Sequence, residues 1–440
     1  MAKQKTKKTD NITEDCWWDS DFPSTITDNY WVYAFVKQQQ NHPKKFNTHK
    51  SGKWLVFADI KEIDTTWQII KKATECGLLG VSAKAATAKP NENAASNNEK
   101  VICVYTYNWQ DVDDVYRVEK ALRSIGIEET LYYKTDSDTH EGKYKVRGSQ
   151  RISKYISKAT RSYRRHGLAS LHGIQDRKVK ILKSIGIKNF DDLLSFDTSQ
   201  KLQGVGVSTA YINKIKLLAL SQVENKIFQL APIQFPDSDI IHFDIETDLD
   251  YSYQDKKVWS IAVHHNHHNN EVKHFYAEKW SQEKNILKEF LKYININKDA
   301  HFFSYFGFDK SVLKFAFARH KLDVDFFLSR NHYDLCALIK QHYVFPLSSY
   351  GLKHVGKYLG YKFKSEHIDG LYAAMRYIHS QESEQKLPKE IFHYIEDDVK
   401  VMHHIIEQLR TRKDIKIIFE HQTDSDRATA SNIGLSQAGV

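Results

Sequence analysis

Three short acidic motifs in the last 200 or so residues contain side chains that can hold metal ions and cleave a phosphodiester. They are His242-Phe-Asp244-Ile-Glu246-Thr, Tyr305-Phe-Gly-Phe-Asp309 and Tyr394-Ile-Glu-Asp-Asp398. Hard divalent cations take oxygen ligands, so carboxylates that converge can bind them. Two such ions about 3.5 to 4 Å apart can activate a water and stabilise the leaving oxygen of a phosphodiester. The motifs therefore predict a metal-dependent nuclease.

The first two motifs lie where a strand and a helix can present their carboxylates. In the strand expected over residues 239–246, Asp244 and Glu246 share a face because side chains two apart point the same way. Asp309 follows a short apolar run at 300–304 and precedes an amphipathic helical pattern. A carboxylate at such a helix start can point back toward the strand ends.

The third motif lies on a long helix expected over residues 388–409, where apolar side chains recur at helical spacing. Tyr394 and Asp398 are one turn apart on this helix and share a face. Each motif alone is a weak signal, because short patterns occur often by chance. Their order along one chain, each on a suitable element, strengthens the interpretation.

In this order the motifs resemble those of the DEDD superfamily of 3'-to-5' exonucleases, which have the ribonuclease H-like fold. The chain is more closely similar to the predicted ribonuclease H-like domain of some RecB-family-associated nucleases, over about residues 239–409. Further matching residues are Tyr333-Asp334-Leu335, Ser349-Tyr-Gly-Leu-Lys353, Leu359-Gly360 and Asp369-Gly370. The resemblance implies a mixed α/β ribonuclease H-like sheet with flanking helices, and hydrolysis of DNA or RNA with two Mg²⁺ or Mn²⁺ ions.

Residue by residue, the resemblance assigns metal binding to four carboxylates and water positioning to a tyrosine. The implied metal ligands are Asp244, Glu246, Asp309 and Asp398, with Asp244 touching both ions. Tyr394 would position the attacking water.

The chain departs from the family pattern in ways that leave alternatives open. The second motif has Ser304-Tyr305 where many members have an asparagine, so contacts with the substrate end are not assigned there. His393 precedes Asp398 by five residues, the spacing of a histidine in a sister subclass, so His393 is an alternative to Tyr394. We favour the tyrosine. The neighbouring Asp397 adds a register ambiguity, which the tyrosine spacing resolves toward Asp398.

Size and charge agree with a multidomain protein that binds nucleic acid. A chain of 440 residues with 41% hydrophobic content can form two or three globular domains. Its net charge of +9 favours a polyanionic partner. No apolar run approaches 18 residues and the lysine-rich N-terminus is unlike a signal peptide, so we expect a soluble cytoplasmic or nuclear protein without a membrane partner. The scattered cysteines Cys16, Cys76, Cys103 and Cys336 indicate neither a disulfide framework nor a zinc site.

Composition and pattern divide the chain into six segments. They are a disordered tail at 1–15, an α+β domain at 16–146, a basic linker helix at 147–170, an all-α helix-hairpin-helix module at 171–225, the nuclease domain at 237–412 and a C-terminal tail at 413–440. Within the α+β domain we expect strands at 54–58 and 101–105 and a helix marked by Val112, Val115, Val118 and Leu122.

The segment 16–146 resembles the Bles family, whose fold is similar to the cap-binding translation initiation factor and which is also described as phosphothreonine-lyase-like. The matching residues are Gly52-Lys-Trp54-Leu, Gly77-Leu-Leu-Gly80, Val101-Ile-Cys-Val-Tyr-Thr106, Asp111-Val-Asp-Asp-Val-Tyr-Arg-Val118 and Tyr133-Lys134-Thr-Asp-Ser-Asp-Thr139. Basic groups come from Lys84, Lys134, Lys143 and Arg147, but the Lys-x-His pairing of the lyases is absent at Ser82-Ala-Lys84-Ala-Ala. A phospho-ligand binding role is therefore favoured over lyase activity.

Two tryptophans of this segment have two interpretations. Trp54 and Trp67 could stack on a nucleic-acid base if they are exposed. Tryptophans are mostly buried, so we expect both to lie in the core.

A basic stretch and two glycine-containing turns are the candidate backbone contacts for nucleic acid. The stretch is Arg151, Lys154, Lys158, Arg161, Arg164 and Arg165, whose spacing predicts one helical stripe that can track phosphates or be a solvated linker. The turns lie in Gly173-Ile-Gln-Asp-Arg-Lys178 and Leu202-Gln-Gly204-Val-Gly206-Val-Ser-Thr209-Ala210, which resemble tandem helix-hairpin-helix modules. Glycines there let backbone N–H groups face a phosphate, although such modules can be structural spacers. The assigned residues are Arg161, Arg164, Arg165, Gly204 and Gly206.

The run His264-His265-Asn-His267-His268 lies between strand-like segments at 258–263 and 271–276. We interpret it as a polar hairpin turn rather than a metal site. Besides the nuclease, two functions stay open for the whole chain: a catalytically silent nucleic-acid-binding adaptor, and an N-terminal domain with its own phospho-ligand binding or lyase-like activity.

Overall fold

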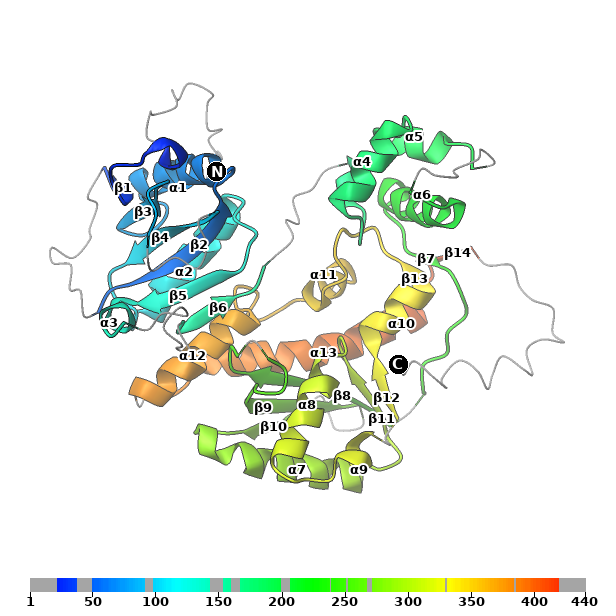
Figure 1. Cartoon of the computed structure of the whole chain (residues 1–440). Coiled ribbons are helices and arrows are strands. Elements are labelled where there is room, and N and C mark those ends of the chain that lie inside the picture. Colours follow the sequence, from blue (N-terminus) through cyan, green and yellow to red (C-terminus); the bar gives the residue numbers. More distant parts are fainter. Residues whose placement is uncertain are drawn as a thin grey trace, which may run out of the picture. The chain divides into compact units, whose positions relative to one another are not determined.

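The computed structural model describes residues 22–37, 50–91, 98–142, 153–159, 167–198, 206–237, 239–250, 252–266, 271–328, 331–383 and 385–418. The chain divides into two compact units, Met1–Thr160 and Arg161–Val440 (Figure 1). Within the described part, every helix is too short or too polar to cross a membrane.

The first unit contains a six-stranded antiparallel sheet. Its strands, in spatial order, are β1 (Trp31–Phe35), β3 (Ser82–Ala86), β4 (Glu99–Thr106), β2 (Gly52–Asp59), β5 (Leu131–Thr135) and β6 (Tyr155–Ser157). Its helices are η1 (Pro23–Thr25), α1 (Ile63–Glu75), α2 (Val112–Ser124) and α3 (Asp136–His140). The two strands and the helix expected from the sequence lie within β2, β4 and α2 and are confirmed.

Trp54 and Trp67 are core residues, as expected. Both are fully buried, and the Nε1 of Trp54 donates to the carbonyl oxygen of Val115 on α2 at 2.9 Å. Neither ring is therefore accessible for stacking on a base.

The expected basic helix over 147–170 is wrong at Tyr155–Ser157, where the structure has a strand. Tyr155–Ser157 form β6, which pairs with β5 so that Tyr155 lies opposite Tyr133. Burial alternates along these three residues, which is the period of a strand, and the pairing with β5 outweighs the helical spacing of the basic side chains. Arg161, Arg164 and Arg165 lie outside the described residues.

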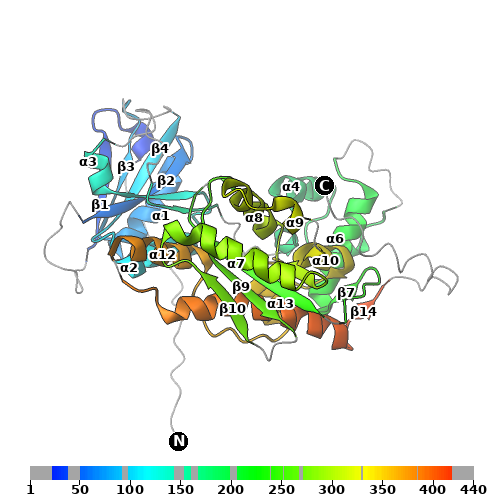
Figure 2. The ribbon, with the colours of Figure 1, turned by 90° about the horizontal axis from the view of Figure 1, so that it is seen from below.

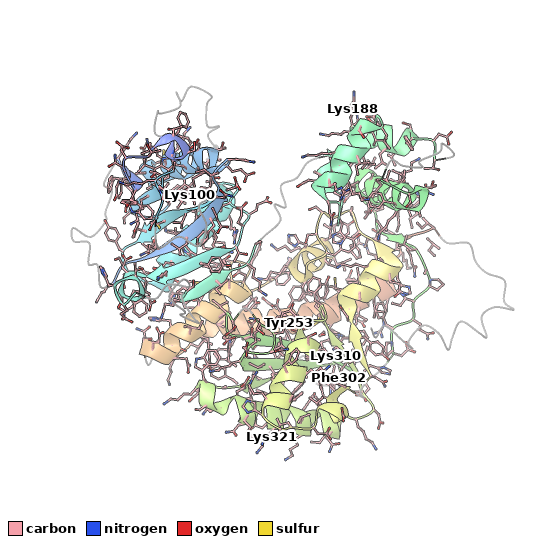
Figure 3. All side chains as sticks on the ribbon, viewed as in Figure 1. Lys100, Lys188, Tyr253, Phe302, Lys310 and Lys321 are labelled. Carbon is pink, nitrogen blue, oxygen red and sulfur yellow. The ribbon has the colours of Figure 1, made fainter. Side chains whose placement is uncertain are left out.

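The second unit begins with four short helical segments. They are η3 (Gly167–Ser170), α4 (Asp176–Ser184), α5 (Phe190–Ser195) and α6 (Thr209–Glu224). They share a hydrophobic core with Phe228 and Val344, which belong to a small sheet in the order β13 (Tyr343–Val344), β7 (Phe228–Gln229) and β14 (Lys416–Ile417). Lys188 lies at the outer end of these helices, in the turn between α4 and α5 (Figure 3).

Two glycines of this helical region have positive φ angles. Gly186, in the α4–α5 turn, has φ +91°, and Gly206, just before α6, has φ +83°, which are conformations that favour glycine. Gly204 lies outside the described residues.

The rest of the unit is built on a mixed five-stranded sheet. The order is β10 (Val272–Tyr276), β9 (Val258–His265), β8 (Ile240–Thr247), β11 (His301–Ser304) and β12 (His332–Asp334). β9 is antiparallel to β8 and β10, whereas β11 is parallel to β8 and β12. The helices are η4 (Trp280–Gln282), α7 (Glu283–Ile296), α8 (Phe308–Arg319), α9 (Val324–Leu328), α10 (Leu335–His342), α11 (Leu352–Tyr358), α12 (Gly370–Ser383) and α13 (Lys389–Thr411). The expected mixed α/β class is confirmed.

Helices cover both faces of this sheet. Figure 1 shows it between α13 on one side and α7 on the other, and in Figure 2 α7 lies in front of β9 and β10. Ile241, Phe243 and Ile245 of β8 share a buried cluster with residues of α7 and α8. Because side chains alternate along a strand, His242, Asp244 and Glu246 point to the opposite face, toward α13.

The histidine run is only partly a turn. The β9–β10 hairpin forms as expected, but His264 and His265 are the last residues of β9 and are 2% and 6% exposed. Burial along β9 continues through them, and the strand extends into the run. His267 and His268 lie outside the described residues.

Candidate metal centre

The structure brings three of the four predicted carboxylates together where α13 crosses β8. One carboxylate oxygen from each of Asp244, Glu246 and Asp398 lies within 4.8 Å of the others. Glu246 and Asp398 are buried, and Asp244 is half-buried. Two neighbouring positions on one strand face and one position on a covering helix are sufficient to build the group.

The sequence of α13 explains why it presents Asp398 to the sheet. Apolar side chains on one stripe are buried, namely Ile391, Ile395, Val399, Met402, Ile406 and Leu409. On its other side α13 approaches α11 closely, because a Cβ on Gly356 would lie 2.3 Å from Cγ2 of Val401. The absence of a side chain at Gly356 therefore fixes how near the two helices come.

Tyr394 lies beside the carboxylates, as the tyrosine spacing predicts. Its side chain is 7% exposed, and its hydroxyl is near enough to the carboxylates of Glu246 and Asp398 to lower the pKa of both. Burial, followed by the charge of Asp398, raises the pKa of Tyr394 well above its usual range, so the hydroxyl stays protonated and donates. The alternative residue, His393, is exposed on another face of α13.

Burial and mutual repulsion disfavour the charged forms of the clustered carboxyls. Burial, then the charge of Asp398, raises the pKa of Asp244 well above its usual range. Burial, then Asp244, does the same for Glu246. Burial raises the pKa of Asp398 to about 7, although Lys353 and the Tyr394 hydroxyl act in the opposite direction.

Asp309 lies in the first turn of α8, as expected, but its carboxylate is outside the close group of three. It is 3% exposed, and its Oδ2 has no hydrogen-bond partner among the described residues. Burial and then the charge of Asp244 raise the pKa of Asp309 well above its usual range, so the two carboxyls interact. A buried carboxylate oxygen without a partner is costly and needs a cation or a proton.

The loop before α8 is held in an unusual conformation. Phe306 has φ +69°, rare for a bulky side chain, and its ring is 43% exposed. Its backbone N–H donates to Oδ1 of Asp334 at 3.0 Å, and the preceding Tyr305 hydroxyl donates to the carbonyl oxygen of Tyr350 at 2.7 Å. These two bonds hold the loop that presents Phe306 to solvent, three residues before Asp309.

Asp397 is occupied elsewhere, which agrees with the register chosen from the sequence. Its carboxylate accepts from the Tyr361 hydroxyl at 3.0 Å and from the backbone N–H groups of Lys364 and Ser365 at 2.7 and 3.2 Å. It fastens the segment after α11 to α13, whereas Asp398 faces the sheet.

Two residues near the site were not assigned a role from the sequence. The Nζ of Lys353 lies 4.8 Å from the centroid of the Tyr394 ring and donates to the carbonyl oxygen of Ile368. Asp369 raises the pKa of Glu246 and accepts from the backbone N–H of Tyr372 at 3.0 Å. Both stand in motifs that carry the family resemblance, but spacing alone does not show that these loops reach α13.

The donor set fits hard divalent cations. All four acids offer oxygen, which is the ligand type of Mg²⁺ and Mn²⁺. The carboxyls repel one another in a buried place, and one oxygen of Asp309 has no partner among the described residues. Cations bound there would offset the repulsion between the carboxylates and would give the Asp309 oxygen a partner.

Comparison with protein-family models finds two matches in this chain. Residues 241–410 match the RNase_H superfamily, and residues 42–141 match Basophilic leukemia-expressed protein Bles03. The first match contains the four acids and Tyr394, and it supports a nuclease-like function with nucleic acid as the partner and divalent metal as the cofactor. The two family resemblances are confirmed at this level, whereas the DEDD type, the 3'-to-5' polarity and the helix-hairpin-helix module stay predictions.

Proposed function

We propose that this chain is a 3'-to-5' exonuclease that hydrolyses phosphodiester bonds of DNA or RNA with two Mg²⁺ or Mn²⁺ ions. The observation that carries the proposal is the convergence of Asp244, Glu246 and Asp398 beside the Tyr394 hydroxyl. The order of the motifs, which resembles that of DEDD exonucleases, supports the polarity and the subclass. The ions would supply an activated water and stabilise the leaving oxygen.

Each residue has a separate role in this proposal. Asp244, Glu246 and Asp398 hold the ions from β8 and α13, and Asp309 adds a carboxylate from α8. Tyr394 keeps its proton because it is buried next to the carboxylates, so its hydroxyl can hold the attacking water in line rather than remove a proton from it.

Two further features fit a single-stranded substrate. The exposed side chain of Phe306, three residues before Asp309, can stack on a base, and such stacking tolerates any sequence. The helical region contacts the segment that holds the Phe306 loop. The His172 ring stacks on Tyr350 with centroids 4.0 Å apart, and the carbonyl oxygen of Tyr350 accepts from the hydroxyl of Tyr305, the residue before Phe306. We propose that these helices act as a helix-hairpin-helix module, with Gly206 and the basic residues Arg161, Arg164 and Arg165 contacting the strand backbone.

The decisive experiment incubates the purified chain with 5'-labelled single-stranded DNA and RNA in Mg²⁺, Mn²⁺ or EDTA. We expect a metal-dependent ladder that shortens from the 3' end, and no ladder with Asp244→Ala. The matched control is Asp299→Ala, which changes an exposed acid in the turn before β11, at the opposite end of that strand from Asp309. Equal loss of cleavage in both variants would indicate misfolding rather than removal of a metal ligand.

A circular single-stranded substrate distinguishes the mode of cleavage. An exonuclease leaves the circle intact and degrades the same strand after it is linearised. Linear products from the circle would contradict the exonuclease and leave a metal-dependent endonuclease. No cleavage of any substrate would favour the adaptor, although a close group of three acids that also interacts with the buried Asp309 argues against a silent site.

A second function is favoured by a group of lysines in the first unit. Lys53 lies opposite both Tyr105 and Lys134 in the sheet register, so the three side chains share a face. The Nζ of Lys84 lies 5.7 Å from the Tyr105 ring centroid and 4.1 Å from that of Trp31. Burial lowers the pKa of Lys84.

We propose that this lysine face binds a phosphorylated ligand. Lys53 and Lys134 are buried, and the Nζ of Lys53 is paired with Asp136, so the part-exposed Lys84 would contact the phosphate while a planar group contacts Trp31. Titration of the full chain with a nucleoside triphosphate and with a phosphothreonine peptide, followed by calorimetry, tests it. Binding that is lost in Lys84→Ala and kept in Lys120→Ala, a change on the exposed face of α2, would support it. Failure of both ligands to bind would contradict it.

A further inference from the structure

Three histidines lie between α13 and the sheet face that carries the carboxylates. His242 is two residues before Asp244, and His264 is its register partner on β9. His403 lies on α13, five residues after Asp398. Side chains two apart on a strand share a face, and so do cross-strand partners. The histidines therefore form a group of their own next to the candidate metal centre.

The three imidazoles converge rather than stack. One ring nitrogen from each of His242, His264 and His403 lies within 4.8 Å of the others. The ring centroids are 5.8, 5.5 and 5.0 Å apart, with interplanar angles of 39°, 71° and 48°. Three imidazoles on one tetrahedral ion, with metal–nitrogen bonds of about 2.0–2.1 Å, would hold their centroids about 5 Å apart. The observed spacing is close to that of a three-histidine site.

The environment of the group leaves polar atoms unsatisfied. His242 is fully buried, and neither of its ring nitrogens has a hydrogen-bond partner of ordinary geometry among the described residues, although the backbone of His264 lies near. The Nδ1 of His403 is also buried without a partner in the described part of the chain. A core histidine usually makes at least one hydrogen bond, so a buried one that makes none requires another ligand.

We propose that His242, His264 and His403 bind one transition-metal ion of the zinc class. Imidazole nitrogen favours Zn²⁺ and its neighbours, whereas the carboxylates favour Mg²⁺ and Mn²⁺, so the two sites take different metals. Three protein ligands leave one coordination position for a water or another group.

The proposed ion has a structural consequence for the nuclease. It connects α13 to β8 and β9 at a point next to the carboxylates, and α13 carries Tyr394 and Asp398. The ion thereby fixes the helix that completes the candidate metal centre. The inference does not depend on nuclease activity, because the histidines can bind metal in an inactive chain.

Zinc titration of the full chain tests the proposal. After removal of metals with EDTA, the protein is titrated with Zn²⁺ against a chromophoric chelator, in excess Mg²⁺ to occupy the carboxylates. We expect about one tightly bound Zn²⁺ per chain, and an affinity lowered about 100-fold or more in His403→Gln, which removes a direct ligand. Asp398→Asn should keep the zinc, because it alters only the other site.

The matched control is the next histidine on α13. The Nε2 of His404 bonds to the carbonyl oxygen of Leu359 at 3.0 Å, and its ring packs on Tyr361, so His404→Gln should bind zinc as the unchanged protein does. Zinc binding that is absent from the unchanged chain, or equal in His403→Gln and His404→Gln, would overturn the proposal.

Cobalt provides a test that needs no variant and so does not depend on folding of a mutant. One equivalent of Co²⁺ added to the metal-free chain in excess Mg²⁺ should give the strong visible absorption of a tetrahedral nitrogen-bound ion. Zn²⁺ should then abolish that absorption by displacement. Only the weak absorption of octahedral oxygen-bound cobalt would contradict a three-histidine site.

Discussion

Replacing Asp398 by asparagine should stabilise the metal-free protein at alkaline pH, although it removes a proposed catalytic ligand. The carboxylate of Asp398 is 7% exposed and lies close to those of Asp244 and Glu246. Without a cation, ionising it requires negative charge in a buried place that already holds acids. Asparagine has nearly the same shape but no charge, so the substitution removes the repulsion and keeps the packing.

The magnitude follows from the pKa. Burial raises the pKa of Asp398 from 3.8 to about 7, and that difference corresponds to at most about 4 kcal/mol at 1.36 kcal/mol per pKa unit. Between these two pH values the folded chain keeps a proton that the unfolded chain loses, so the stability of the metal-free protein falls as pH rises through this window. Asp398→Asn should therefore gain stability at pH 8 and little at pH 4.

Thermal unfolding in EDTA at pH 4, 6 and 8, followed by calorimetry, measures the effect. The unchanged chain should lose stability toward pH 8 more steeply than Asp398→Asn. Added Mn²⁺ should stabilise the unchanged chain at pH 8 and have a smaller effect on the variant, because only the former keeps the full ligand set.

The adjacent acid is the matched control and should respond with the opposite sign. Asp397→Asn disturbs a carboxylate that accepts three hydrogen bonds, and each bond left unsatisfied costs about 1–3 kcal/mol. If Asp398→Asn were instead less stable than the unchanged chain in EDTA at pH 8, the repulsion inferred from the structure would be refuted.

Four other substitutions test separate parts of the site. Tyr394→Phe should lower kcat about 100-fold or more with little change in KM, while His393→Ala should leave both unchanged; the reverse would reassign the water-positioning role. Phe306→Ala should weaken binding of a single strand by about 1–3 kcal/mol, measured by fluorescence anisotropy with catalysis blocked in EDTA. Gly356→Ala should destabilise the chain by about 1–3 kcal/mol in urea unfolding, because its Cβ would lie 2.3 Å from Val401; an unchanged midpoint would show that the helices can move apart.

The parts of the site that the sequence predicts are those set by local backbone geometry. Asp244 and Glu246 share a face because a strand has a period of two, and Tyr394 and Asp398 share one because a helix has a period near four. These relations hold wherever the element packs, so they could be derived before the fold was seen. The position of Asp309 in a first helical turn is predictable for the same reason.

The relations that the sequence did not predict depend on pairing between distant segments. The basic stretch around Tyr155 has helical spacing, yet it forms a strand because an edge of β5 is available to it. Lys353 reaches the Tyr394 ring only because α11 packs on α13, where Gly356 allows a close approach. Neither the pairing of β6 with β5 nor the packing of α11 on α13 can be predicted from local sequence patterns, because both depend on which surfaces meet.

The register between β8 and β9 determines the carboxylate and histidine groups together. On the α13 face, Asp244 and Glu246 lie opposite Ala262 and Ser260, two small residues that leave room for the acids and for whatever binds them, while His242 lies opposite His264. On the other face, the apolar side chains of the two strands are buried together under α7 and α8. A slip of one residue would turn the apolar side chains of one strand away from α7 and α8, and it would also separate the histidines and crowd the carboxylates. The hydrophobic core thus selects the register, and the register in turn places both groups of potential metal ligands, which explains why neither group could be assembled from its own motif alone.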